Sequence, residues 1–351
     1  GVTFKELIPQ LENQGLRLAG PLLPRASKSV ITSCLEREPM IMPKYQWDHI
    51  DPLFTLNVVF GTGDVMRTGS ASGPGPLERL ATDLACSLGP GQADFCRFLT
   101  GAQGTMGVVT WATIRAELLP RLQKLYFIPS QRIEGLIDCI YRFMRRGFGG
   151  VCNECFILNN FNLSVILTEE WPEEFGALRE NLPPWVLIAC IGGYRRPEEI
   201  VEIREKYLMT ITQELGLTPM LTLPGAPGKE KRMLELLSKP WTEEPYWKLR
   251  YKRSRQEVFF LTTLNRTPEF IESMYRLAAR HGYPTADIGV YIQPIVKGTA
   301  CHCEFDLPYN PDIPREVETV RRLSTEASGT FANMGAFFSR PYGILADAVY
   351  S

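Results

Sequence analysis

The sequence predicts an α+β protein in which helices cover one face of a mainly antiparallel sheet. From about residue 120 onward, short β-branched and aromatic runs alternate with stretches whose apolar residues recur at helical spacing. Before that point the periodicity is weaker, and glycine, proline and serine are frequent. We therefore expect two domains, residues 1–119 and residues 120–351.

Length and charge restrict the classes of partner. The chain has 351 residues, enough for about two domains with a core in each. Its net charge of -1 gives no electrostatic reason to expect nucleic acid or an anionic membrane as a partner. No apolar run approaches the ~18 residues that cross a bilayer, and the first residues do not resemble a signal peptide. We predict a cytoplasmic protein that binds a small molecule, with no nucleic acid and no membrane as partner.

The elements of the first domain follow from local patterns. The stretch TFKELIPQLENQGL has the apolar stripe of an amphipathic helix, which Thr3 caps and Gly15 ends. FTLNVVFGTGDVMRTG predicts a hairpin. Residues 70–94 are rich in glycine, proline, serine and alanine, which indicates a loop with a helical turn. The run GVVTWA begins a strand that continues to about Leu119.

The second domain alternates strands with helices. We expect a last helix over Pro314–Ser328 and a long charged helix over Glu198–Leu215. Strands are expected in KLYFIPS, CNECFILN, PWVLIACIGGY and EVFFLTTL, a pair of strands in DIGVYIQPIVKGTACHCEFDL, and further helices in RIEGLIDCIYRFMRRG and PEFIESMYRLAARHG.

The cysteines indicate free thiols. Their number, 9, is odd, and they are scattered without the framework of a small disulfide-rich protein. Cys152 and Cys155 have the spacing of metal ligands, as do Cys301 and Cys303. In a strand, however, Cys301 and Cys303 point to the side opposite His302, so the three cannot converge on one ion. We therefore predict no metal site.

Residues 99–112, LTGAQGTMGVVTWA, place three glycines directly before an apolar strand. Glycine there indicates positive φ or a close approach of the backbone to another group. The spacing is not the dinucleotide fingerprint of a parallel nucleotide-binding fold, which follows a strand and opens a helix. Taken alone, the stretch favours a turn followed by a buried strand, with the glycines serving only packing.

Taken together, several stretches resemble the FAD-linked oxidase family that includes vanillyl-alcohol oxidase, 4-cresol dehydrogenase and the glycolate and D-lactate oxidases. NVVFGTGDVMRTG is similar to the family's strand with V-x-G-D-G. FCRFLTGAQGTMGVVTWA, from Phe95 to Ala112, resembles F-x-x-L-x-x-G-x-x-G-T-L-G-V-V-T-x-A, with Met106 in place of leucine. GVYIQPIVKGTACHCEFDLPY and GAFFSRPYG resemble the aromatic-alcohol branch. The resemblance covers nearly the whole chain and is weak in the middle.

The resemblance implies a partial FAD-binding domain of the vanillyl-alcohol oxidase type in residues 1–119, followed by a substrate or cap domain in residues 120–351. In such a fold, glycines let backbone amides approach the flavin and its diphosphate without an intervening Cβ. FAD is then the expected cofactor, and the residues implied to bind it are Gly101, Gly104, Thr105, Gly107, Val108 and Thr110.

The implied reaction is hydride transfer from an aromatic alcohol, alkylphenol or hydroxy acid to the flavin. A phenolate that develops in the substrate suits the fixed donors of an arginine, and Arg340 in FFSRPYG matches the family's arginine. Ser339 stands where that branch has a tyrosine. By strand spacing, Tyr291 and Gln293 share a face, and Glu304 follows on the returning strand. The candidate catalytic residues are Arg340, Tyr291, His302 and Glu304, and the candidate substrate-binding residues are Gln293, Tyr342 and Asn153.

The sequence also departs from the family. Its opening, GVTFKEL, resembles the segment after the family's diphosphate-binding loop, and SKSVITSCLEREPMIMPKYQWDHID lacks the glycine pair of T-V-G-G-x-x-A-x-N. The chain also stops short of the segment that closes the cofactor domain in the family. Two hypotheses stay open: a second polypeptide completes the flavin site, or the chain is a flavin-free relative that acts as a binding or accessory subunit. Assembly into a homo-oligomer is left open as well.

Overall fold

The computed structural model describes residues 1–44, 52–73, 75–76, 93–145, 151–341 and 343–350. It divides the chain into two units. The first unit comprises residues 1–40 and 45–119, and the second comprises residues 41–44 and 120–351.

The first unit begins with helix α1 (Phe4–Glu12), which a capping box starts. The Thr3 hydroxyl accepts a hydrogen bond from the Glu6 backbone N–H at 3.3 Å, and the Glu6 carboxylate accepts one from the Thr3 N–H at 2.8 Å. Gly15 follows the helix at φ 70°. The helix, its cap and its end are as the sequence predicts. The unit also contains the short elements β1 (Leu16–Leu18), α2 (Val30–Leu35), η1 (Gly69–Ser72), α4 (Cys96–Leu99) and β5 (Ala116–Leu118).

A three-stranded antiparallel sheet forms the rest of the first unit. Its order is β3-β2-β4, from β2 (Leu53–Phe60), β3 (Val65–Arg67) and β4 (Gly107–Ile114). The strands β2 and β3 form the predicted hairpin, and β4 begins where the strand after the glycine-rich turn was predicted. The prediction that this strand continues to about Leu119 is wrong, because β4 ends at Ile114 and β5 belongs to another sheet. Separately, β1 pairs with β5. Most of the loop predicted for residues 70–94 lies outside the described residues.

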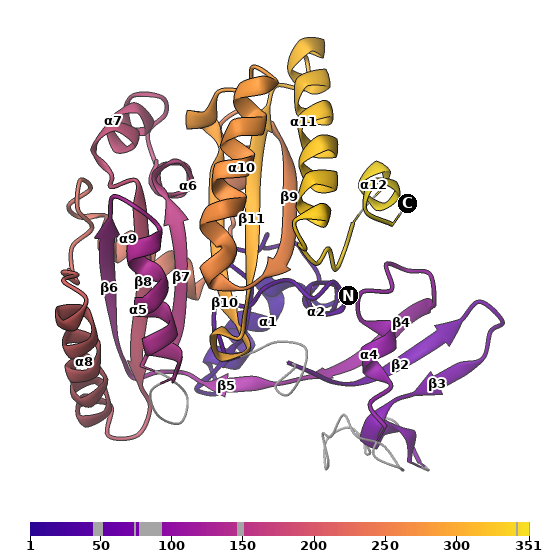
Figure 1. The fold of residues 1–351 in the computed structure, drawn as a ribbon. Coiled ribbons are helices and arrows are strands. Elements are labelled where there is room, and N and C mark those ends of the chain that lie inside the picture. Colours follow the sequence, from indigo (N-terminus) through magenta and orange to yellow (C-terminus); the bar gives the residue numbers. More distant parts are fainter. Residues whose placement is uncertain (45–51, 74, 77–92, 146–150, 342, 351) are drawn as a thin grey trace. The chain divides into compact units, whose positions relative to one another are not determined.

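The second unit is built on a six-stranded sheet in which every pairing is antiparallel (Figure 1). The strand order is β6-β8-β7-β10-β11-β9. The strands are β6 (Leu122–Ser130), β7 (Glu154–Asn159), β8 (Trp185–Gly193), β9 (Ser254–Thr262), β10 (Gly289–Ile295) and β11 (Ala300–Tyr309).

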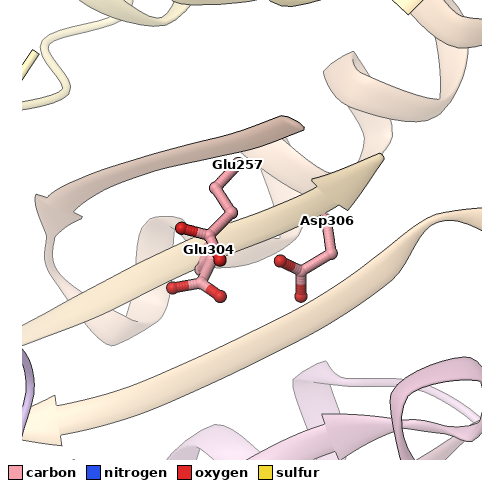
Figure 2. Close-up of side chains that lie close together, drawn as sticks. All are labelled: Glu257, Glu304 and Asp306. Atoms are coloured by element: carbon pink, nitrogen blue, oxygen red, sulfur yellow. The ribbon is translucent and has the colours of Figure 1, made fainter. Parts of the chain in front are cut away.

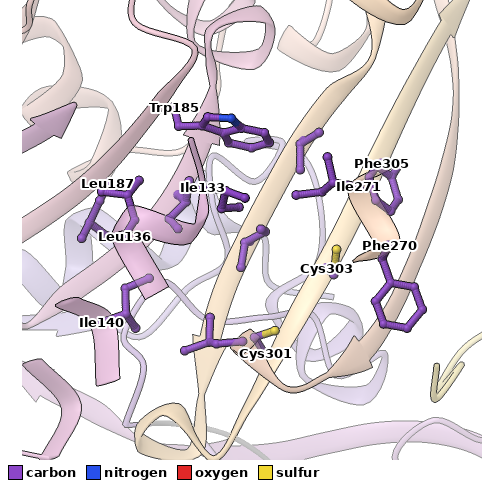
Figure 3. Close-up of a cluster of buried hydrophobic side chains, with 14 of the residues drawn as sticks. Ile133, Leu136, Ile140, Trp185, Leu187, Phe270, Ile271, Cys301, Cys303 and Phe305 are labelled. Atoms are coloured by element: carbon purple, nitrogen blue, oxygen red, sulfur yellow. The ribbon is translucent and has the colours of Figure 1, made fainter. Parts of the chain in front are cut away.

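Long helices cover one face of this sheet and enclose the apolar core with it. Figure 3 shows part of that core, in which Leu136, Phe270 and Cys303 lie among other buried side chains. The sequence-based fold class, an antiparallel sheet with helices on one face, is confirmed. The helices on this face are α5 (Glu134–Arg145), α8 (Pro197–Glu214), α10 (Thr267–Arg280) and α11 (Pro314–Asn333).

Several helices were not predicted. In α6 (Asn160–Leu167) every residue after the first is buried, so the helix has no polar stripe by which a sequence pattern could reveal it. The other elements that the sequence did not reveal are α7 (Glu173–Asn181), α9 (Lys229–Ser238), α12 (Ile344–Tyr350), η2 (Trp247–Leu249), η3 (Leu264–Arg266), η4 (Thr285–Asp287) and η5 (Val296–Gly298).

None of the described helices has both the length and the apolar composition that a membrane span requires.

The eight described cysteines are all buried thiols. Cys301 and Cys303 face the helices within the apolar core, whereas His302 points to the opposite face of β11. This is the arrangement that strand periodicity predicts.

Truncation of the core should be far more costly than truncation at the surface. Phe260 is 0% exposed and packs against Phe270, Phe305, Phe331 and Phe338. We expect Phe260→Ala to lower the free energy of unfolding by about 3–5 kcal/mol, measured by urea unfolding. Phe337, at 61% exposure, is the matched control, and Phe337→Ala should change the free energy of unfolding by less than about 0.5 kcal/mol. Similar losses in the two variants would contradict the assigned core.

Candidate functional site

A buried polar cluster lies on the sheet face opposite the long helices. In the β10–β11 pairing, Tyr291 is directly opposite Glu304, and Gln293 is directly opposite His302. Directly opposed residues of an antiparallel pair share a face. All four side chains are buried. The structure thus brings together four of the predicted site residues.

Gln293 holds the middle of this cluster in place. Its Oε1 accepts a hydrogen bond from the Tyr291 hydroxyl at 2.9 Å. Its Nε2 donates to the carbonyl oxygens of Cys155 at 3.0 Å and Pro294 at 2.9 Å. Both amide hydrogens of Gln293 are therefore used within the protein, where they tie β10 to β7.

Glu304 is an ionised carboxylate shared between two partners. Its Oε2 lies 2.9 Å from His302 Nε2, and its Oε1 accepts a hydrogen bond from Lys248 Nζ at 2.6 Å. Burial alone would raise the pKa of Glu304, but the positive charge of Lys248, the hydrogen bond from His302 and the nearby Arg255 lower it far below its ordinary value.

Glu304 is also one of three carboxylates that meet in the cluster. Figure 2 shows them converging: Glu257, Glu304 and Asp306. The Lys248 ammonium contacts both glutamates and lies 4.0 Å from Asp306 Oδ1. Arg255 contacts Asp306. Because a protein ammonium already lies where a bound cation would be, the cluster is a buried ion-pair network and not a cavity for a metal.

The aromatic ring of Phe259 contacts both His302 and a further cationic group, Arg340. The Phe259 ring stacks on the His302 imidazole with centroids 5.6 Å apart, and the Arg340 guanidinium lies 4.5 Å from the Phe259 centroid. Burial lowers the pKa of His302, the Glu304 carboxylate opposes that shift, and the charges of Arg340 and Lys248 add to it. His302 is therefore held as a neutral imidazole.

Arg340 borders a cavity of about 420 Å³ at the edge strand β9. The residue is only 6% exposed, and its buried Nε has no hydrogen-bond partner among the described residues. Leaving a buried donor unsatisfied is costly. A guanidinium in the wall of a cavity is also suited to hold an anionic ligand. The other lining residues are Arg255, Gln256, Glu257, Val258, Phe259, Tyr309, Val317, Val320, Arg321, Ser324, Phe338, Pro341 and Leu345.

Two predicted substrate-binding residues are not part of this arrangement. Asn153 Oδ1 accepts hydrogen bonds from the Gly192 N–H and Arg204 Nη1, each at 2.6 Å, and its Nδ2 donates to the Tyr194 hydroxyl at 3.0 Å. These partners lie outside the polar cluster, so Asn153 serves to hold neighbouring segments together. Tyr342 lies outside the described residues.

In the first unit, the glycine-rich turn has an open backbone. Gly101 and Gly104 have φ values of 78° and 80°, and apart from the chain neighbours no atom of the described residues lies within 4 Å of the place that a Cβ would take. The Gly104 N–H has no hydrogen-bond partner among the described residues. Gly107 differs, because its Cβ would lie 2.6 Å from the Val59 carbonyl oxygen, so its glycine serves the close packing of β2 and β4.

The surface after the turn is apolar and accessible. Val108 is 67% exposed, and Val65 on the same sheet face is 62% exposed. The Thr110 hydroxyl accepts a hydrogen bond from Asn57 Nδ2 at 2.7 Å, and the Thr105 hydroxyl donates to the Ala102 carbonyl at 2.6 Å. Open glycine backbone beside an apolar surface fits a cofactor with a diphosphate and a flat ring system, such as FAD.

The chain has the fold of the vanillyl-alcohol oxidase type of FAD-binding proteins, as the resemblance in sequence predicted. A crystal structure of p-cresol methylhydroxylase with substrate bound matches with a TM-score of 0.77 and 16% identity, over 97% of this chain and 67% of that chain. The isoeugenol complex of 4-ethylphenol oxidase from Gulosibacter chungangensis matches with a TM-score of 0.76 and 15% identity, over 99% of this chain and 68% of that chain. Alkyldihydroxyacetonephosphate synthase matches with a TM-score of 0.61 and 13% identity, over 96% of this chain and 58% of that chain.

No protein-family model and no curated protein sequence matches the chain. At the identities of these solved structures, the likeness shows the fold alone. The chemistry therefore has to be argued from this chain's own residues.

Sequence reasoning missed part of the cluster. Arg255, Glu257 and Phe259 alternate along β9, and this period of two was a signal that they share a face. Lys248 lies in the short 3₁₀ helix η2, which has no periodic pattern, so nothing in the sequence pointed to its contact with Glu304.

The neutral state of His302 predicts a pH dependence of stability. The folded protein holds the His302 pKa below that of the unfolded chain, which is about 6.5. The contribution of the neutral His302 to the free energy of unfolding is present above about pH 6.5. It is lost as the pH falls toward the folded pKa, because the unfolded state binds the proton more readily. We expect the free energy of unfolding, measured with urea, to fall less in His302→Gln than in the wild type when the pH is lowered from about 7.5 to about 5.

His281→Gln is the matched control for this measurement. His281 contacts Glu326 near the surface, so its variant should keep the wild-type pH dependence apart from a small offset. An unchanged slope in His302→Gln would show that His302 is not held neutral.

Proposed function

We propose that this chain is an FAD-linked oxidoreductase, or a subunit of one, that removes hydride from an aromatic alcohol, alkylphenol or hydroxy acid. The observation that carries the proposal is Arg340, a buried guanidinium with an unsatisfied Nε at a cavity. It stacks on Phe259 beside the His302–Glu304 pair. A donor for an anion and a neutral base thus both contact one aromatic ring.

The first unit supplies the residues that would hold the cofactor. Gly101 and Gly104 offer backbone without a Cβ, and Val108 offers an apolar surface. When bound, FAD supplies the hydride acceptor. Thr105, Gly107 and Thr110 would support this surface from the turn and from β4.

The second unit supplies the groups that would act on the substrate. Arg340 would donate hydrogen bonds to a phenolate or carboxylate oxygen, and its planar fork fits both. His302 would accept the proton of a substrate hydroxyl, and Glu304 would stabilise the resulting imidazolium. Tyr291 lies beside them, with its ring 5.8 Å from the His302 ring. The apolar walls of the cavity favour an aromatic or alkyl body.

A second function is favoured by a specific observation. The segment that aligns with the family's glycine pair forms the helix α2, whose Ser33 and Cys34 side chains are buried. This packed segment does not offer the open backbone of a glycine pair. The alternative is a binding or accessory subunit that holds the same anionic ligands without flavin, or that binds flavin only with a second polypeptide.

The glycine-rich turn can be tested with matched variants. Gly104 and Gly15 both have positive φ and open space around the missing Cβ, so alanine strains both to a similar degree. We expect Gly104→Ala to weaken FAD binding at least about tenfold, which equals about 1.4 kcal/mol, while Gly15→Ala leaves it unchanged. The measurement is a spectral titration with FAD. A colourless protein at saturating FAD would contradict flavin binding by the chain alone.

Arg340 can be tested on the loaded protein. We expect Arg340→Met to lower kcat/KM by about 100-fold or more on a substrate chosen from aryl alcohols, alkylphenols and hydroxy acids, because a charge-stabilising donor is lost. Arg321, which lines the same cavity but pairs with Glu318 at the surface, is the control, and Arg321→Met should change kcat/KM little. Equal effects of the two variants would exclude a specific role for Arg340.

A further inference from the structure

We propose that Lys248 is a positioning residue that holds His302 in a single neutral tautomer, with the proton on Nε2 and the lone pair on Nδ1. Its role in turnover rests on the proposed oxidoreductase function. The arrangement itself belongs to the flavin-free protein and can be measured there.

The contacts form a short relay. Lys248 Nζ lies 2.6 Å from one carboxylate oxygen of Glu304, and the other oxygen lies 2.9 Å from His302 Nε2. An ionised carboxylate can only accept hydrogen bonds, so Nε2 must be the donor. A neutral imidazole carries a single N–H, which leaves the lone pair on Nδ1.

Lys248 is the group that keeps Glu304 ionised. Glu304 is buried, and a buried carboxyl without a cation takes up a proton instead of remaining charged. A protonated Glu304 could donate its proton to Nε2, and His302 would then be free to adopt the other tautomer. Arg255 is the next cation, but it lies 3.8 Å from Glu304 and contacts Asp306. The tautomer of His302 therefore depends on Lys248 more than on Arg255.

Nδ1 is the ring nitrogen of His302 that forms no hydrogen bond with a described residue. In the proposed reaction it would accept the proton of a substrate O–H, with the O–H electron pair remaining on the substrate oxygen. The charged and titratable groups around His302 are Glu304 and Asp306 on β11, Arg255 and Glu257 on β9, Tyr291 on β10, Lys248 on η2, and Arg340 after α11.

The low histidine count makes a direct measurement practical. The chain has 3 histidines, so a two-bond ¹H–¹⁵N correlation spectrum of the flavin-free protein contains few imidazole signals. His302→Gln identifies the His302 signal, and His281, which pairs with Glu326, serves as the internal reference. In the wild type at about neutral pH we expect the neutral Nε2–H tautomer of His302.

Two variants then test the role of Lys248. Lys248→Met removes the charge and keeps the length of the side chain. It should raise the pKa at which the His302–Glu304 pair takes up a proton by about one unit or more, because the pair then lacks the ammonium charge that opposes the added proton. Lys248→Arg keeps a cation and should restore the wild-type pKa and tautomer. The His281 signals should be the same in all three proteins.

Three results would overturn the proposal. The first is an Nδ1–H tautomer, or a charged His302, in the wild type at about neutral pH. The second is a Lys248→Met protein whose His302 pKa and tautomer match the wild type. The third applies if Lys248→Met loses the folded His281 signals: Lys248→Gln, which can still donate to Glu304 without charge, then replaces it, and an unchanged His302 pKa there overturns the proposal as well.

The proposed function fails by a different measurement. Absence of flavin binding or of substrate oxidation would contradict the oxidoreductase assignment and would leave the histidine spectrum as it is. A wrong tautomer would contradict the role of Lys248 and would leave flavin binding as it is.

Discussion

The register between β10 and β11 is the constraint on which the second unit depends. It turns Cys301 and Cys303 toward the helices and His302 and Glu304 toward the opposite face. A shift by one residue would exchange the two sets and place two ionisable groups in the apolar core. On its other edge β10 is held against β7, where the Gln293 amide donates to the carbonyl oxygen of Cys155 at 3.0 Å. The apolar core and the polar cluster are thus two faces of one strand pairing.

The ion pairs on the polar face orient side chains more than they stabilise the fold. Bringing several charges out of water costs free energy that their mutual attraction only partly returns, so apolar replacements of similar shape are often as stable. Removing one partner is different, because the charge that remains is buried without compensation. Burial lowers the pKa of Arg255 to about 10, although its acidic neighbours favour the charged form. Such a network is rigid, and that rigidity gives His302 a defined partner and orientation.

Sequence reasoning succeeded where structure is periodic. The common face of Tyr291 and Gln293 followed from the strand period, whereas the place of Glu304 on that face also depends on the β10–β11 register. Most helices on the core face have an amphipathic stripe. It failed for α6, which is buried on nearly all sides, and for Lys248, whose partner Glu304 is 56 residues away in the chain. Gly107 shows a third limit, since a motif glycine can be required by strand packing where its neighbours in the motif have open backbone.

The cationic side chains of the second unit differ in their partners. Lys248 and Arg255 are committed to carboxylates of the cluster, whereas Arg340 has a buried Nε without a hydrogen-bond partner among the described residues. A guanidinium in that state selects for an oxyanion. The Phe259 ring contacts both the Arg340 guanidinium and the His302 imidazole, so one aromatic side chain links the wall of the cavity to the carboxylate cluster.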